Sequence, residues 1–299
     1  MFLRIITGII GIAISAFLIQ TGGTPFAGFA ILLALIAWDE YCSVFQRAGV
    51  STAYVFGAIT LILMLCCAWL GNFEELLGAM TLGTIAMFTL MVIFGLRPTD
   101  ICVSAAGLIY IGMPFTHIIL LRFLTDEGIP SENVDTVQNL SDVIASLVTN
   151  FDLSQLQALF NLDTGCKLIW ILFLCTWASD TFAYFIGSAI GSHKVAPSIS
   201  PNKTVEGIFG SLIGTIFTAI LFGHLLFAFE LSQMAILGLI MAIAATLGDL
   251  AESTIKRSAG IKDSGFLIPG HGGVLDRFDS MFFTAPVFYY FAVLTGLTS

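Results

Sequence analysis

Two long apolar runs decide the fold of this chain. Residues 52–71 read TAYVFGAITLILMLCCAWLG, and residues 76–96 read LLGAMTLGTIAMFTLMVIFGL. Neither run holds a charged residue, and each matches the stretch of about 20 apolar residues that a helix needs to cross a bilayer. The two runs therefore predict membrane-spanning helices rather than the amphipathic helices of a soluble protein.

Runs of this kind recur along the whole chain of 299 residues. They occupy residues 2–20, 24–38, 52–71, 76–96, 102–121, 166–190, 205–228, 232–250 and 277–297. Only 10% of the residues are charged, against roughly 25% in a soluble domain, and 57% are hydrophobic. This composition excludes a water-soluble enzyme and a nucleic-acid-binding protein. It predicts an all-α integral membrane protein with about nine transmembrane helices, of which the run 24–38 is the weakest because it is short and ends before Asp39 and Glu40.

The basic residues predict the orientation of these helices, because Lys and Arg collect on the cytoplasmic side of membrane proteins. With the N-terminus inside, nine of the eleven basic residues fall in cytoplasmic segments: Arg4, Arg47, Arg97, Lys194, Lys203, Lys256, Arg257, Lys262 and Arg277. Arg122 and Lys167 fall on the opposite side. We therefore expect a cytoplasmic N-terminus and an external C-terminus. No organelle transit peptide is seen, so we expect the inner membrane of a bacterium.

The distribution of polar residues divides the chain into three parts. Residues 1–122 are almost purely apolar, and we expect them to form a scaffold of transmembrane helices with a role in dimerisation. Residues 123–165 form a polar, acidic outer loop. Residues 166–299 hold the clusters of ionisable side chains, and we expect them to form the catalytic region.

The first cluster lies inside a predicted helix. Asp180, Tyr184, Gly187 and Gly191 are spaced so that they share one helix face. An ionisable residue within the bilayer faces the protein interior or a water-filled cavity, and the glycines let a neighbouring helix or a ligand approach closely. The pattern therefore indicates either a binding site or close helix packing around one paired carboxylate.

The second cluster is Ser200-Pro201-Asn202-Lys203-Thr204. Ser followed by Pro is typical of a helix start, with Ser as N-cap and Pro at the first helical position. A helix N-terminus offers free N–H groups and partial positive charge, to which Lys203 adds a full charge. The segment therefore predicts either a phosphate cradle or an ordinary helix start.

The densest cluster runs from the eighth apolar run to the last one. Asp249, Glu252 and Lys256 are spaced i, i+3 and i+7, and Asp276 and Asp279 are three residues apart, on one helix face. Mg²⁺ takes oxygen ligands and is usually shared between carboxylates and substrate phosphates. Carboxylates among several basic residues therefore predict a site for a metal-bound polyphosphate. A solvated loop would explain the basic residues but not the acids at the ends of two spans.

Residues 253–279 read STIKRSAGIKDSGFLIPGHGGVLDRFD. This stretch resembles the signature of phosphatidate cytidylyltransferases, also called CDP-diacylglycerol synthases. Three upstream motifs are similar as well: D-x-x-A-Y-x-x-G at 180–187, S-P-x-K-T-x-E-G at 200–207 and G-D-x-x-E-S at 248–253. The first 122 residues are similar only as apolar spans.

The resemblance implies an enzyme of phospholipid biosynthesis that converts CTP and phosphatidate to CDP-diacylglycerol and pyrophosphate. It implies a helical, dimeric membrane protein whose polar cavity opens to the cytosol and to the bilayer. It also implies dependence on Mg²⁺, with one or two metal ions held by Asp249, Asp276 and Asp279.

The chemistry of this reaction suggests roles for the other polar residues. Phosphatidate is already an anionic nucleophile, so the main obstacle is the repulsion between two polyanions, which positioning and electrostatic stabilisation overcome. We expect the substrates to be bound by basic and polar side chains: Lys203, Lys256, Arg257, Lys262, Arg277, Ser200, Asp180 and Tyr184. Lys256 is grouped with the three acids as catalytic. His271 either donates a hydrogen bond to pyrophosphate or belongs to a glycine-rich turn.

Two alternatives stay open. The chain is either a phosphatidate enzyme or a CTP-dependent transferase that acts on another lipid, such as an archaeal ether lipid or a polyprenol. An ion-coupled transporter, with Asp180 and Asp249 as ion sites, is the alternative from a different class. A transporter would more often show inverted repeats with matched polar positions in two halves, whereas here the polar clusters gather in the C-terminal part.

Overall fold

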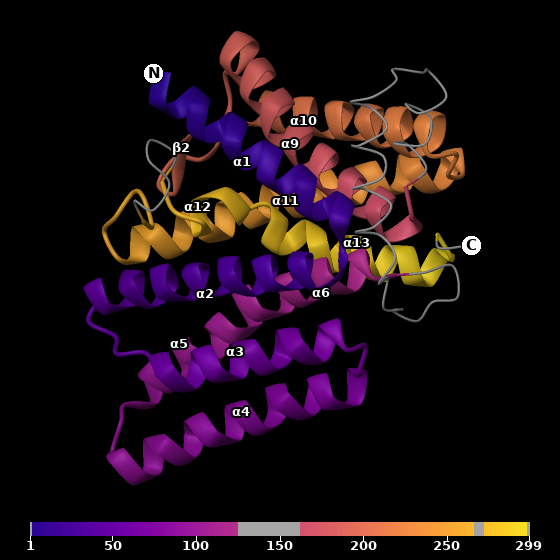
Figure 1. The fold of residues 1–299 in the computed structure, drawn as a ribbon. Coiled ribbons are helices and arrows are strands. Elements are labelled where there is room, and N and C mark those ends of the chain that lie inside the picture. The colour runs from indigo at the N-terminus through magenta and orange to yellow at the C-terminus, as the bar shows by residue number, and fades with distance from the viewer. Residues whose placement is uncertain (1, 125–161, 266–271, 298–299) are drawn as a thin grey trace.

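The computed structural model describes residues 2–124, 162–265 and 272–297 as a bundle of long helices (Figure 1). The first half comprises α1 (Phe2–Thr21), α2 (Gly23–Arg47), α3 (Tyr54–Trp69), α4 (Phe73–Phe94), α5 (Pro98–Gly107), the π-helical segment η1 (Leu108–Gly112) and α6 (Met113–Arg122). The second half comprises α9 (Thr164–Ile190), β1 (Lys194–Ala196), β2 (Ser200–Thr204), α10 (Val205–Thr218), the π-helical segment η2 (Ala219–Leu226), α11 (Leu231–Ser258), α12 (Leu275–Phe278) and α13 (Met281–Thr295). The predicted outer loop lies mostly outside the described residues.

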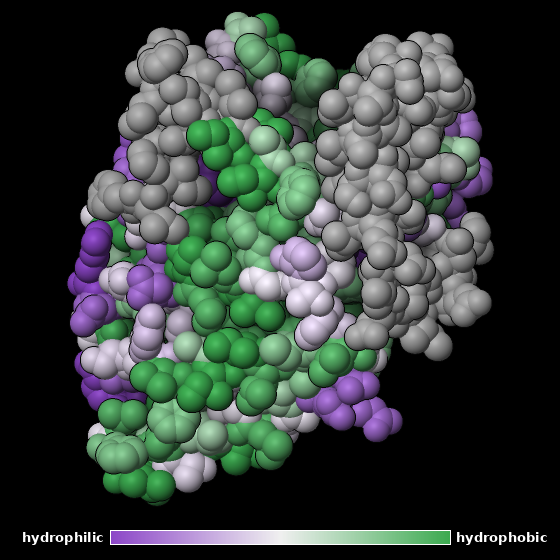
Figure 2. Space-filling model, in the orientation of Figure 1, coloured by the Kyte–Doolittle hydropathy of each residue, from purple (hydrophilic) through white to green (hydrophobic). Residues whose placement is uncertain are grey.

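Apolar composition and length qualify six of the described helical segments as membrane spans: Gly23–Arg47, Phe73–Phe94, Pro98–Arg122, Thr164–Ile190, Val205–His224 and Leu231–Ser258. Three shorter apolar helices, Ile10–Thr21, Tyr54–Trp69 and Met281–Thr295, accompany them. The chain is therefore a mostly helical, multi-pass membrane protein, and nine spans stay a prediction. Figure 2 shows a broad hydrophobic surface on one face of the molecule, with hydrophilic side chains toward its edges, as a bilayer-embedded protein requires.

Helix α2 is longer than the predicted run 24–38. It continues through Asp39 and Glu40 to Arg47. Asp39 is exposed near the helix end, whereas the buried Glu40 accepts hydrogen bonds from the backbone N–H groups of Val274 and Leu275. Because tertiary partners satisfy Glu40, its charge does not end the helix as the hydropathy pattern suggested.

Small residues bring α9 and α10 together. A Cβ added to Gly207 would lie 2.9 Å from the Ala183 carbonyl oxygen, and one added to Gly214 would lie 2.2 Å from the Phe182 ring. Ser179 and Ser211, both buried, share a hydrogen bond of 2.7 Å between these helices. Glycine and serine contacts of this kind are typical of helix association in membranes.

The predicted helix start at Ser200-Pro201 is wrong. Ser200–Thr204 forms strand β2, which pairs antiparallel with β1 and lies beside the helix bundle. Pro201 lacks an N–H group, and a two-stranded ribbon has edges on which such a residue is tolerated. Thr204 is the actual N-cap of α10, with extended backbone and a side-chain oxygen that accepts a hydrogen bond of 3.2 Å from the N–H of Gly207. The hairpin is also the departure from the predicted all-α fold.

Candidate active site

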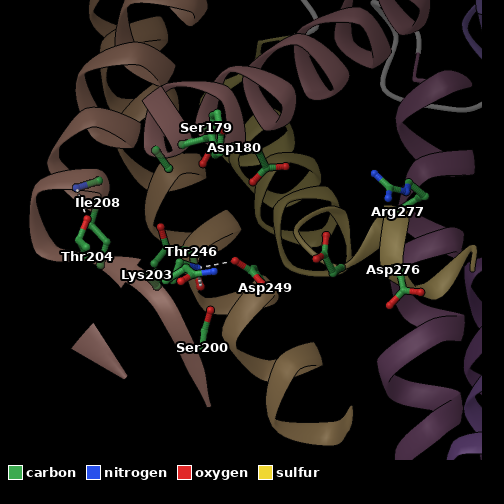
Figure 3. A pocket seen from close by; sticks show the side chains of 15 residues that line it. Ser179, Asp180, Ser200, Lys203, Thr204, Ile208, Thr246, Asp249, Asp276 and Arg277 are labelled. Atoms are coloured by element: carbon green, nitrogen blue, oxygen red, sulfur yellow. Dashed lines mark hydrogen bonds and ion pairs between the residues drawn. The ribbon is translucent and has the colours of Figure 1, made fainter. Parts of the chain in front are cut away.

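A polar cavity of about 350 Å³ lies among α9, β2, the start of α10, α11 and the α12 region. It gathers eight of the residues proposed from the sequence: Asp180, Tyr184, Ser200, Lys203, Asp249, Asp276, Arg277 and Asp279. Figure 3 shows Asp180, Lys203 and Asp249 on one side, with Asp276 and Arg277 on the separate segment that carries α12. Elements that are distant in the sequence thus contribute to one cavity.

Lys203 projects from β2 across the cavity to α11. Its Nζ donates hydrogen bonds to Oδ2 of Asp249 at 2.8 Å and to the carbonyl oxygen of Thr246 at 3.0 Å. Only 12% of the Lys203 side chain is exposed, so its ammonium group is partly desolvated. Its electrostatic attraction to an anion is stronger there than it would be in water. The hairpin, rather than a helix start, therefore delivers this lysine to the site.

Three carboxylates form an acidic wall of the cavity, and one of them is the partner of Lys203. Asp249, Asp180 and Asp279 come from α11, α9 and the connection between α12 and α13, and Ser280 donates hydrogen bonds to two of them. The negative charges of Asp249 and Asp180 act on Asp279, so the three carboxylates repel one another. This wall therefore holds more negative charge than its own hydrogen bonds neutralise.

Asp276 has different partners from Asp279, although both line the cavity. Oδ1 of Asp276 accepts a hydrogen bond of 2.7 Å from Nζ of Lys256, and Oδ2 accepts bonds from the backbone N–H groups of Ser264 and Gly273 at 3.0 and 2.9 Å. Burial alone would raise the pKa of Asp276, but the hydrogen bonds from Lys256 and Gly273 outweigh it and bring this pKa down to about 2. Asp276 is therefore a fixed negative charge.

Lys256 bridges two acids. Its Nζ lies 2.6 Å from Oε2 of Glu252, a residue buried on the same helix, and 2.7 Å from Oδ1 of Asp276. Lys256 is thus not among the residues that line the cavity, and it connects α11 to the α12 segment through Asp276. The sequence placed Glu252 in the motif but gave it no role.

The structure does not bring every predicted residue to the cavity. Arg257 is exposed and donates hydrogen bonds to the carbonyl oxygens of Ile199 and Ile261, where it connects the hairpin to the end of α11. Lys262 is exposed, and it is not among the residues that line the cavity. His271 lies outside the described residues. A Cβ added to Gly187 or Gly191 would lie 3.0 or 2.7 Å from the side-chain oxygen of Thr204, so these two glycines let the end of α9 pack against the end of β2.

The fit of the site to a divalent cation rests on its donors. Asp180, Asp249 and Asp279 offer the hard oxygen ligands that Mg²⁺ takes, and their mutual repulsion would be relieved by a cation. Among the described residues, no three His, Cys, Asp or Glu side chains converge closely enough to hold a metal ion by themselves. An open arrangement of this kind suits Mg²⁺, which keeps water or substrate oxygens among its ligands.

Sequence reasoning missed several polar residues at or near the site. Ser179, Asn202 and Thr246 line the cavity, and Glu40 and Ser264 hold the loop before α12. Asn202 lies inside the recognised S-P-x-K motif, which was the available signal. Glu40 would have stood out as an ionisable residue within a span had the second helix been extended beyond residue 38.

Known proteins resemble this chain along its full length. The cytidylyltransferase family model matches residues 2–295. A phosphatidate cytidylyltransferase of Synechocystis sp. is 33% identical over 293 residues, which cover 97% of this chain and 96% of the relative. That of Staphylococcus haemolyticus is 31% identical over 296 residues, covering 96% and 97%. That of Bacillus subtilis is 28% identical over 300 residues, covering 97% of both. The similarity therefore includes the N-terminal helices, which carry none of the recognised motifs.

Proposed function

The chain belongs to the cytidylyltransferase family, and from that premise we propose that it transfers CMP from CTP to phosphatidate, giving CDP-diacylglycerol and pyrophosphate. It is a membrane-embedded nucleotidyltransferase. The observation that carries the proposed reaction is the cavity, in which Lys203 and Arg277 share the wall with Asp180, Asp249, Asp276 and Asp279. A cavity that holds both basic and acidic groups suits a reaction between two polyanions.

The proposed reaction needs positioning rather than covalent catalysis. A phosphate oxygen of phosphatidate forms a bond to the α-phosphorus of CTP, and the bond from that phosphorus to the bridging oxygen breaks, so that pyrophosphate carries away the electron pair. Lys203 and Arg277 lie on the cavity wall, where they would bind phosphate oxygens and reduce the repulsion between the substrates. Arg suits bidentate phosphate contacts, whereas Lys acts as a point charge.

Mg²⁺ would be held by Asp249 and Asp279, with Asp276 as the third ligand proposed from the resemblance. When bound, the ion would supply Lewis-acid and template chemistry at the phosphates. In the structure Asp276 accepts a hydrogen bond from Lys256. Asp180, rather than Asp276, interacts electrostatically with Asp279 together with Asp249. Asp180 therefore joins the proposed acidic wall, and Lys256 keeps the Asp276 carboxylate oriented toward the cavity.

The proposed setting is a bacterial inner membrane with the cavity facing the cytoplasm, where CTP is found. The first helix begins and the last helix ends at opposite ends of the bundle (Figure 1), as termini on opposite sides of the membrane require. The hairpin and α12 lie at the end where α1 begins (Figure 1). Tyr184, 70% exposed on α9 at the rim of the cavity, would face the lipid substrate. We also propose a homodimer, on the resemblance alone.

Transfer from labelled CTP tests this function directly. Protein purified in detergent is incubated with α-labelled CTP, phosphatidate and Mg²⁺, and lipid products are separated. We expect labelled CDP-diacylglycerol, its loss when a chelator removes Mg²⁺, and a loss of several orders of magnitude in Asp276→Asn, because the amide cannot replace the fixed charge. Glu74→Gln, an exposed acid on α4, is the control that keeps the wild-type rate.

The same assay distinguishes the alternatives. Labelled product with a polyprenyl or ether lipid phosphate, but not with phosphatidate, would keep the chemistry and overturn the substrate. If the product formed equally well in the presence of the chelator, the proposed requirement for Mg²⁺ would be overturned. Absence of any CTP-dependent product from folded protein would overturn the proposed function and favour transport.

A further inference from the structure

One carboxylate of the N-terminal helices contacts the residues at the start of α12, which carries Asp276. Glu40 lies on α2 and is only 6% exposed. Its Oε1 accepts a hydrogen bond of 3.0 Å from the N–H of Val274, and its Oε2 accepts one of 2.8 Å from the N–H of Leu275. The hydroxyl of Ser264 donates a longer bond of 3.4 Å to Oε2. Glu40 thus bonds to Ser264 and also to the two residues at the start of α12.

Two glycines make room for this side chain. A Cβ on Gly265 would lie 2.5 Å from Oε1 of Glu40, and a Cβ on Gly273 would lie 2.4 Å from Oε2. Real Cβ atoms do not approach oxygen so closely, so any larger residue would push the carboxylate or the loop aside. The glycines of the segment are therefore fitted to Glu40, in addition to any turn that they allow.

Glu40 and Asp276 accept hydrogen bonds from the same two stretches of chain, at Ser264 and at residues 273–275. Ser264 donates its backbone N–H to Asp276 and its hydroxyl to Glu40. Gly273 donates its N–H to Asp276, and the next two N–H groups point to Glu40. The place of Asp276 at the cavity therefore depends on a loop whose other side rests on Glu40.

We propose that Glu40 is a positioning residue for the transfer reaction, acting from the N-terminal helices through the loop that carries Asp276. This inference rests on the proposed function. The role requires a carboxylate, because the three groups around Glu40 are all donors and only an ionised acid accepts through both oxygens. An amide would turn an N–H group toward a backbone N–H group.

The test compares Glu40→Gln with Asp39→Asn, a matched control that removes the same charge from the neighbouring, exposed position of α2. For Glu40→Gln we expect kcat to fall about 10- to 100-fold, the range expected when a buried hydrogen bond to a charged group is lost, with a smaller change in KM for phosphatidate. Asp39→Asn keeps wild-type constants. Glu40→Asp keeps the charge on a shorter side chain and recovers part of the lost rate.

A second measurement separates this inference from the proposed reaction. Hydrogen–deuterium exchange of the purified protein follows the amides of residues 273–280, and we expect about tenfold faster exchange in Glu40→Gln but not in Asp39→Asn. If Glu40→Gln exchanged faster in this segment alone, while the wild-type protein formed no product from CTP, the proposed function would be overturned and the contact would still be supported.

Three results would overturn the positioning role: an unchanged kcat in Glu40→Gln, unchanged exchange at residues 273–280, or an equal loss of melting temperature and rate in both Glu40→Gln and Glu40→Asp. The last of these would indicate a purely structural residue.

Discussion

The helices up to Arg122 and those from Thr164 onward use buried polar groups in different ways. In α2–α5 these groups bond to one another: Asp100 pairs with Arg97 and the N–H of Ser51, the Tyr41 hydroxyl donates to the carbonyl of Val103, and the Trp38 indole donates to that of Tyr54. In α9–α13 several charged groups instead line a common cavity. Polar bonds in the first region satisfy the backbone and fix the packing, whereas those in the second leave charge available to a substrate.

Glu40 is the exception, because it belongs to the first region by sequence and to the second by contact. The comparison therefore predicts that substitutions in the two regions differ in kind. Changes to the charged groups of the cavity should alter rates, and changes within α2–α5 should alter stability.

Among the substitutions that compare the two regions, the largest effect is expected at Asp249. Asp249→Asn removes the charge that faces Lys203, and we expect the rate of CTP-dependent transfer to fall by about 10²- to 10³-fold, as for other losses of electrostatic stabilisation. Initial rates at saturating CTP and phosphatidate measure it. Asp100→Asn makes the same chemical change in the first region, and there we expect a lower melting temperature with unchanged rates. If Asp100→Asn reduced kcat as strongly as Asp249→Asn, the distinction between the regions would be wrong.

An intermediate effect, on stability alone, is expected at Gly57 of α3. A Cβ there would lie 1.9 Å from the Trp38 ring, so Gly57→Ala overpacks the contact between α2 and α3 and should cost about 1–3 kcal/mol. Thermal unfolding in detergent measures the loss, and KM for CTP should not change below the melting temperature. Gly78→Ala is the control, because an added Cβ meets no atom within 4 Å in the described part of the chain. Equal melting temperatures for the two variants would contradict the close contact.

The smallest effect is expected at the start of α10. Thr204→Ala removes the oxygen that accepts the N–H of Gly207 and should lower stability by about 1 kcal/mol. Thr204→Ser keeps the oxygen and should stay closer to the wild type in chemical or thermal unfolding. The opposite order would show that the methyl group of Thr204, which packs on Gly191, matters more than the cap.

The local character of the chain could be predicted because hydropathy is a local property. Each predicted apolar run coincides with helical structure in the described residues, and Asp249, Asp276, Arg277 and Asp279 line one cavity. Local signals failed where a distant partner changes the outcome. The Ser200-Pro201 pair has the chemistry of a helix start, yet pairing with β1 makes it a strand, and Glu40 looks like a helix end until its donors on the loop are known.

The sequence by itself determined the membrane-spanning helices and the family, since both depend on residue types at fixed spacing along the chain. Only the tertiary structure decided which groups meet. Lys203 reaches Asp249 across 46 residues, and Glu40 reaches Leu275 across 235. Such contacts depend on how α2, α11 and the hairpin pack against one another, and no local pattern records that packing. The cavity is therefore a property of the packed bundle, while its chemistry is already present in the side chains.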